Sequence, residues 1–267
     1  MGIHGVATTG ARTGRVDPLL ADRVVEALLL VGLPVAHGGH GPGVHLLATD
    51  GGDGGPDTDR WPVTLRWICS PRLEGAAAVA GADARSPWSR TRQVVADSME
   101  TALAELLPAL GVSATRADAD GPTLVGPGSS DAPAGAGAGS SPAGSAAAGG
   151  EIEIEVHPAV AAAVRRGAAL AGLPLARGPR TSGVAFAACG PAAGTTDGQA
   201  AAADGEAAAV VDVAWQPSHQ LPGEPLVATA VREAMHHAVG TALAACGLRT
   251  SWHRPADSAP HLHVTDH

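Results

Sequence analysis

The sequence Gly32-Leu33-Pro34-Val35-Ala36 recurs, with one substitution, as Gly172-Leu173-Pro174-Leu175-Ala176. Around this run, a constant shift of 140 positions aligns residues 16–48 with residues 156–188 without a gap. Further identities in this alignment fall at Val16, Pro18, Ala21, Val24, Leu30, Gly38, Gly43, Val44 and Ala48. Because a period this long exceeds that of solenoid repeats, we predict a tandem pair of whole small domains.

The correspondence continues beyond the first stretch when loops of different length are allowed. Residues 67–73 align with residues 215–221 at a shift of 148, which pairs Trp67 with Trp215. Residues 95–111 align with residues 231–247 at a shift of 136. The order of the matched segments is the same in both halves, so the repeat is predicted to extend over each module.

Composition marks the boundary between the modules. Residues 126–150 consist almost entirely of Gly, Ala, Ser and Pro, which is typical of a flexible linker that buries no core. We therefore predict a disordered N-terminal tail over residues 1–15, a first module over residues 16–125 and a second module over residues 151–267.

Each module is predicted to begin with a helix. Asp17 before Pro18 fits an N-cap followed by proline at the first helical position, and Gly32 ends the apolar periodicity. The stretch 157–172 repeats this pattern. A short strand that contains Pro34 is expected to follow, at the edge of the sheet because proline cannot donate to a ladder. The remaining predicted strands are 44–49, 62–69, 112–116 and 123–125, and in the second module 184–189, 209–215, 248–252 and 261–264.

A second helix, which ends at Gly111 and at Gly247, completes each module. The predicted order is helix-β-β-β-helix-β-β, which is an α+β fold with an antiparallel sheet and helices on one face. This order resembles that of the type III secretion chaperone fold. The resemblance is one of topology, since no sequence motif of that family is present in the chain.

The open face of each predicted sheet suggests how the modules meet. Along 63–69 the apolar side carries Val63, Leu65 and Trp67, whereas the other side is mixed. A mixed face suits a moderately polar contact, so we predict that the modules pair through these faces as an intramolecular pseudo-dimer. Trp67 and Trp215 lie on the apolar sides and are therefore expected to pack in the cores.

Charge and cysteine content suggest a cellular compartment. The formal net charge of -9 disfavours nucleic-acid and anionic-membrane partners, because both require a positive surface. Cys69, Cys189 and Cys246 form no C-x-x-C pair, which fits reduced thiols in the cytoplasm. No signal peptide is predicted in residues 1–15, and the apolar runs are too short to span a bilayer. The absence of Lys, Asn and Tyr is typical of a very GC-rich bacterial coding sequence.

The histidines supply one candidate site. His236, His253, His261 and His263 are predicted metal ligands, because imidazole is a good ligand and Glu233-x-x-His236 places a carboxylate on the same side of a helix. His37 and His40 form a weaker candidate at a turn. Arg177 and Arg180 occupy the corresponding positions of the second module, and arginine binds no metal.

No catalytic residue and no cofactor are predicted, since the chain has no Walker A, G-x-S-x-G or H-E-x-x-H sequence. The leading hypothesis is a non-enzymatic cytoplasmic protein of two related modules that contact each other and bind a protein or peptide. The alternative is a metal-binding protein or metal-dependent enzyme with its site at the four histidines of the second module.

Overall fold

The computed structural model describes residues 17–36, 40–48, 63–81, 83, 85–118, 121–126, 157–178, 180–186, 210–221, 225–253 and 261–265. The predicted tail, residues 1–15, and all of the predicted linker except Gly126 lie outside these residues. The first half of the chain forms α1 (Pro18–Val31), β1 (Gly43–Ala48), β2 (Val63–Ile68), α3 (Pro71–Val79), α4 (Pro87–Ala109), β3 (Ser113–Arg116) and β4 (Thr123–Gly126). The second half forms α5 (Pro158–Ala171), β5 (Gly183–Phe186), β6 (Val210–Gln216), α6 (Pro225–Ala245), β7 (Arg249–His253) and β8 (His261–Thr265).

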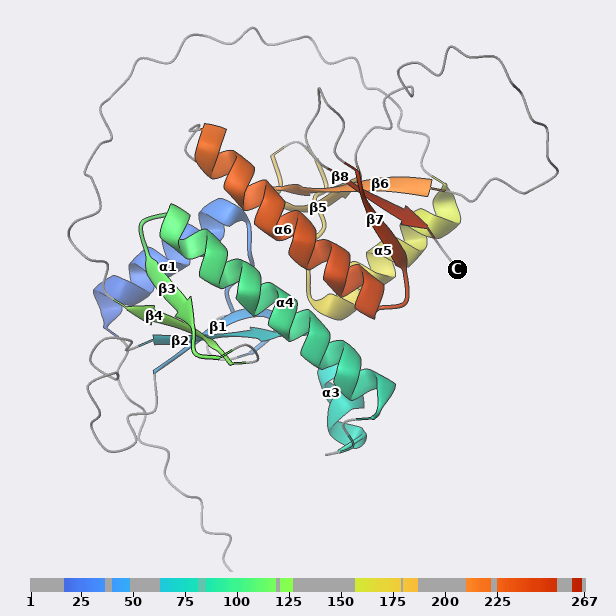
Figure 1. Cartoon of the computed structure of the whole chain (residues 1–267), viewed down its shortest axis with the longest axis horizontal. Helices are drawn as coiled ribbons and strands as arrows, with labels where there is room; N and C mark the ends of the chain where they lie inside the picture. The colour runs from blue at the N-terminus through green and yellow to red at the C-terminus, as the bar shows by residue number, and fades with distance from the viewer. Residues whose placement is uncertain are drawn as a thin grey trace, which may run out of the picture.

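The described residues build a mixed α+β fold with two four-stranded antiparallel sheets, as Figure 1 shows. The strand order is β1-β2-β4-β3 in the first sheet and β5-β6-β8-β7 in the second. One face of each sheet is buried, because Val63, Leu65 and Trp67 of β2 are buried while Arg66 between them is exposed. The predicted α+β class is confirmed. No helix that the described residues form is long and apolar enough to cross a bilayer.

The predicted strand around Pro34 is wrong. Instead, a single parallel bridge joins Val35 to Val44, and an equivalent bridge joins Leu175 to Val184. The Val44 N–H donates to the Pro34 carbonyl at 2.8 Å, but proline has no N–H with which to continue a ladder. The order in each half is therefore helix, two strands, a long helix and two strands, and the first half adds the short helix α3 before the long one.

The first helix of each half begins and ends as its sequence predicts. Asp17 Oδ1 accepts the N–H of Leu19 at 3.1 Å, and Pro18 occupies the first helical turn. Gly32 and Gly172 close α1 and α5 in the left-handed conformation, with φ of 88° and 81°. The buried side of α1 consists of Leu20, Val24, Ala27, Leu28 and Val31.

The two halves meet through their helices. Figure 1 shows α4 and α6 side by side and antiparallel, and Thr91 Oγ1 near the start of α4 donates to the Ala245 carbonyl at the end of α6 at 3.1 Å. By contrast, the outer face of the first sheet leaves Arg66 and Leu47 exposed. The prediction that the halves pair through their open sheet faces is therefore wrong, because the halves meet through the apolar sides of α4 and α6 instead.

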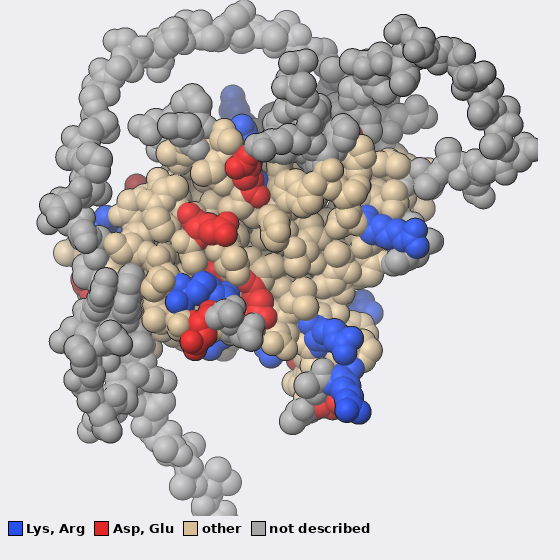
Figure 2. Space-filling view, viewed as in Figure 1, with Lys and Arg blue, Asp and Glu red and all other residues tan. Residues whose placement is uncertain are grey.

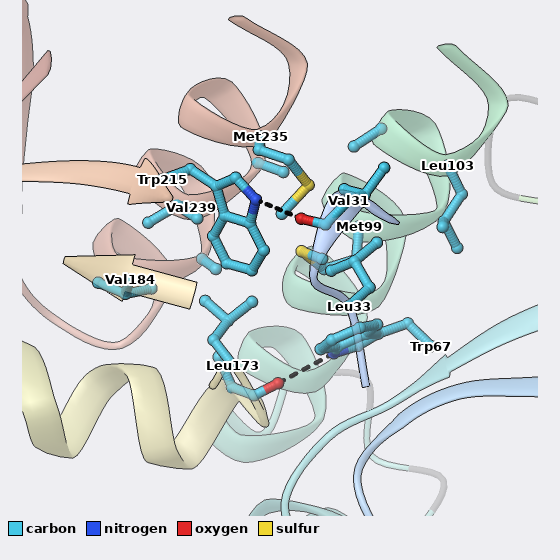
Figure 3. Close-up of a cluster of buried hydrophobic side chains, with 14 of the residues drawn as sticks. Val31, Leu33, Trp67, Met99, Leu103, Leu173, Val184, Trp215, Met235 and Val239 are labelled. Carbon is cyan, nitrogen blue, oxygen red and sulfur yellow. Dashed lines mark hydrogen bonds between the residues drawn. The ribbon is translucent and has the colours of Figure 1, made fainter. Parts of the chain in front are cut away.

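Two tryptophans bind the opposite half of the chain with the same geometry. Trp67 Nε1–H donates to the Ala171 carbonyl at 2.9 Å, and Trp215 Nε1–H donates to the Val31 carbonyl at 2.9 Å (Figure 3). Both side chains are 2% exposed, which confirms that they pack in the core. Each indole therefore satisfies its polar group on the C-terminal turn of the other half's first helix.

A second pair of hydrogen bonds also joins the two halves in both directions. The Ser70 N–H donates to the Leu170 carbonyl at 3.2 Å, and the Ser218 N–H donates to the Leu30 carbonyl at 3.1 Å. Side chains of both halves, including Met99 and Met235 of the two long helices, join one continuous buried cluster (Figure 3). The hydrophobic core is thus shared between the halves.

Candidate ligand-binding pocket

A pocket of about 500 Å³ lies where the two halves of the chain meet. The first half contributes α3 and the start of α4, and the second half contributes α5 and the end of α6. Its volume is in the range that holds a small molecule or a few side chains of a peptide. We call it the junction pocket; it is lined by Ser70, Arg72, Trp88, Ala163, Arg166, Gly167, Ala169, Leu170, Cys246, Gly247 and Leu248.

Local sequence signals place the walls of this pocket. Ser70 is the N-cap of α3, since its Oγ accepts the Leu73 N–H at 3.3 Å, and the Ser70 N–H ties that cap to the end of α5. Gly167 brings α5 close to the end of α6, because a Cβ there would lie 3.1 Å from Leu243 Cδ2 and 3.2 Å from Leu248 Cδ1. The pocket therefore depends on contacts between segments that are far apart in the sequence.

The charged groups of the junction pocket are two arginines. Arg72 and Arg166 are exposed, and none of the described residues that line the pocket is acidic. Among the described residues, neither guanidinium has a carboxylate within ion-pair distance; the arginines that do form ion pairs are Arg66, Arg92 and Arg116. Figure 2 shows arginine side chains gathered over α3 and the first turns of α4. This pocket is accordingly suited to an anionic group.

The net charge of the whole chain differs from the charge of the part that forms the junction pocket. The described residues include thirteen arginines and eleven acidic residues, so the net negative charge of -9 comes from the remaining segments. The acidic balance that disfavours anionic partners for the whole chain therefore does not apply to the junction pocket.

The polar and aromatic groups beside the arginines favour binding over catalysis. The Trp88 side chain is 43% exposed and offers an uncovered indole. Burial raises the pKa of the Cys246 thiol to about 11, so Cys246 is protonated at neutral pH and is a poor nucleophile. Ser70 Oγ already serves as a helix cap. The junction pocket therefore presents two arginine side chains beside an apolar wall to a ligand.

The predicted histidine ligands lie on two different sides of the second sheet. The register pairs position 253 with 261 and position 251 with 263, and His263 Nε2 lies 3.2 Å from Asp212 Oδ1 on the neighbouring strand. Leu262 and Val264, which alternate with these positions, are buried. The positions of His253, His261 and His263 are thus on the side of the sheet away from the helices.

His236 lies on the opposite, helix-covered side. Its imidazole is 1% exposed and stacks edge-on against Trp252, with ring centroids 5.9 Å apart. His236 and His263 therefore lie on opposite sides of the sheet, while the side chains of His253 and His261 lie outside what the structure describes. Among the residues that the structure describes, no group of three His, Cys, Asp or Glu side chains has the arrangement of a metal site. The metal site at His236, His253, His261 and His263 stays a prediction.

The weaker candidate at the first turn is only partly described. His37 lies outside the described residues, and His40 is exposed. His45, one strand position beyond that turn, is buried, and its Nε2 is 2.9 Å from the Gly41 carbonyl. The Gly41 carbonyl thus gives the buried His45 imidazole a polar partner within the turn.

A buried carboxylate occupies the position that corresponds to His236 in the first half. Glu100 is 2% exposed, and its Oε1 accepts the Trp67 N–H at 3.1 Å, beyond the point where β4 stops pairing with β2. Arg66 and Arg116 approach its Oε2 at 3.9 and 3.8 Å. Burial raises the pKa of Glu100 above its ordinary value of 4.5, and the Trp67 hydrogen bond and the two arginines partly oppose that rise.

The substitution Glu100→Gln tests whether burial outweighs the Trp67 hydrogen bond and the two arginines in setting the pKa of Glu100. Because the folded-state pKa is raised, ionised Glu100 costs stability at neutral pH, and that cost disappears as the pH falls through the folded pKa toward 4.5. The wild-type protein should therefore gain stability relative to Glu100→Gln between pH 7 and pH 4.5, measured by urea unfolding. Glu105→Gln, at an exposed position of the same helix, reports the effect of losing one surface carboxylate. The opposite trend would show that the arginines outweigh burial.

Sequence analysis did not identify the residues of the junction pocket. Three different helices carry Arg72, Trp88 and Arg166, and the sequence pattern of each helix does not indicate a shared site. The Ser70-Pro71 and Ser86-Pro87 pairs are helix starts, and they mark α3 as separate from α4. Comparison of the chain with protein-family models, with curated proteins and with solved structures gives no match.

Proposed function

We propose that the protein is a non-enzymatic cytoplasmic protein that binds a peptide segment of a partner in the junction pocket. The observation that carries this proposal is that the pocket is walled by both halves and holds two arginines that have no acidic partner among the described residues. Peptide sites in general combine an apolar wall with a few polar groups that fix orientation. The junction pocket has both, together with an exposed indole of the kind that is enriched at binding sites.

We further propose that the two halves are copies of one module that pack as an intramolecular pseudo-dimer. In a two-fold interface, each contact from the first copy to the second is matched by the equivalent contact from the second copy to the first. The hydrogen bonds of Trp67 and Trp215, and those of Ser70 and Ser218, follow this rule at the shifts that align the sequence repeat. In this arrangement α3, which has no counterpart among the described residues of the second half, makes one end of the pseudo-dimer different and supplies a wall of the pocket.

Selection of random phage-displayed peptides on the full-length protein tests the binding proposal. Ala169→Trp should weaken binding of the enriched peptides strongly, because Ala169 is an exposed lining residue and an indole there competes with the ligand for the same space. Ala230→Trp makes the same change at an exposed position near the other end of α6 and should leave binding unchanged. Failure to enrich any peptide, or equal binding by both variants, would refute the proposal.

A further inference from the structure

We infer that the junction pocket recognises an acidic side chain with an apolar residue beside it in the bound peptide. The inference rests on the proposed function and adds the chemistry of the ligand. Arg72 extends from α3 of the first half, and Arg166 from α5 of the second half. Two cationic groups thus reach one pocket from elements more than ninety positions apart in the chain.

The need for a negative charge follows from what surrounds these guanidinium groups. Among the described residues, Arg72 and Arg166 make no ion pair, and none of the eleven lining residues is acidic. Guanidinium stays charged at physiological pH, so a ligand that displaces its water must compensate the charge. A neutral ligand would offer these exposed guanidinium groups no counter-charge, whereas a carboxylate pairs with the planar guanidinium fork through two hydrogen bonds.

The apolar neighbour is indicated by the rest of the lining. Trp88 is 43% exposed, and Leu170 and Leu248 lie in the same wall. Covering an exposed indole and aliphatic groups is favourable at about 25 cal/mol per Å² of apolar surface. An acidic residue followed or preceded by a Leu, Ile or Val supplies the carboxylate and the apolar cover together.

A peptide fits these groups better than a nucleic acid does. Binding of a nucleic-acid strand requires a track of positive charge along its backbone and usually several stacking rings. The junction pocket offers two cations and one aromatic side chain, and so no such track of positive charge.

Matched peptides on the full-length protein test the inference. The probes are dye-labelled acetyl-Leu-Glu-Leu-Glu-Leu-amide and its counterpart with Gln in place of each Glu, measured by fluorescence polarisation. The acidic peptide should bind at least about tenfold more tightly than the neutral one, because a charge-assisted hydrogen bond is stronger than a neutral one. Arg166→Ala and Arg72→Ala should each remove most of that difference. Arg165→Ala makes the same charge change on the next residue, which stacks over Phe186 outside the pocket, and should preserve the difference.

The possible results separate the inference from the proposed function. Equal binding of both peptides, blocked by Ala169→Trp, would overturn the acidic-peptide inference and leave peptide binding in the pocket standing. No binding of either peptide, together with an empty phage selection, would overturn both. Tighter binding of a ten-nucleotide thymidine strand than of the acidic peptide, lost in Arg166→Ala, would overturn the inference in favour of a nucleic-acid ligand.

Discussion

Trp215→Ala is expected to lower the free energy of unfolding by about 3 to 5 kcal/mol, and Trp67→Ala by a similar amount. Each indole is 2% exposed and fills space between the two halves, so its loss leaves a cavity in the shared core. It also leaves the Ala171 or Val31 carbonyl without the indole N–H that it accepts. Similar losses at the two positions are what a two-fold arrangement requires.

Urea unfolding followed by circular dichroism measures both effects. If the halves share one core, wild-type protein should unfold in a single transition, and each substitution should shift that whole transition. Trp88→Ala is the matched control, because Trp88 is 43% exposed and its loss should change stability by less than about 1 kcal/mol. Two separate transitions, of which each tryptophan affects only one, would contradict the pseudo-dimer.

Local signals in the sequence predicted the parts of the fold that depend on neighbours in the chain. Asp17 and Gly32 mark the two ends of α1 because capping and the left-handed conformation are decided within a few residues. Alternation along 63–69 identified the buried side of β2 and so the burial of Trp67. The strand expected at Pro34 failed because a single proline limits that segment to one bridge.

The contact between the two halves depends on packing between distant elements, which the sequence pattern of one strand or helix does not predict. A mixed outer sheet face fits a polar interface and a solvated face equally well, and the exposure of Arg66 shows the second outcome. The junction pocket requires α3, which the described part of the second half does not repeat, and the approach of α5 to the end of α6. Its residues come from α3, α4 and α5 and from the segments just before α3 and just after α6, and no spacing within the sequence links them.

Gly32→Ala is expected to cost about 2 to 4 kcal/mol, more than the same change at the left-handed Gly111. Gly32 has φ of 88°, where a side chain is strained, and its missing Cβ leaves room for the Ser182 side chain of the other half. Gly172 is the equivalent residue, and a Cβ there would lie 2.9 Å from Pro42 Cβ. Both glycines therefore let one half approach the other closely, where a methyl group would separate them.

Gly111→Ala separates the two contributions to that cost. Gly111 has φ of 77°, and nothing lies within 4 Å of a Cβ placed there, so its substitution should cost only about 1 to 2 kcal/mol of backbone strain. Adding Ser182→Gly to Gly32→Ala removes the clashing side chain and should return the loss to the Gly111→Ala value, as a double-mutant cycle of urea unfolding would show. Because Gly32 and Ser182 belong to different halves, this rescue requires that the halves pack in the observed register. If Gly32→Ala costs no more than Gly111→Ala, the close approach is absent in solution and the pseudo-dimer is wrong.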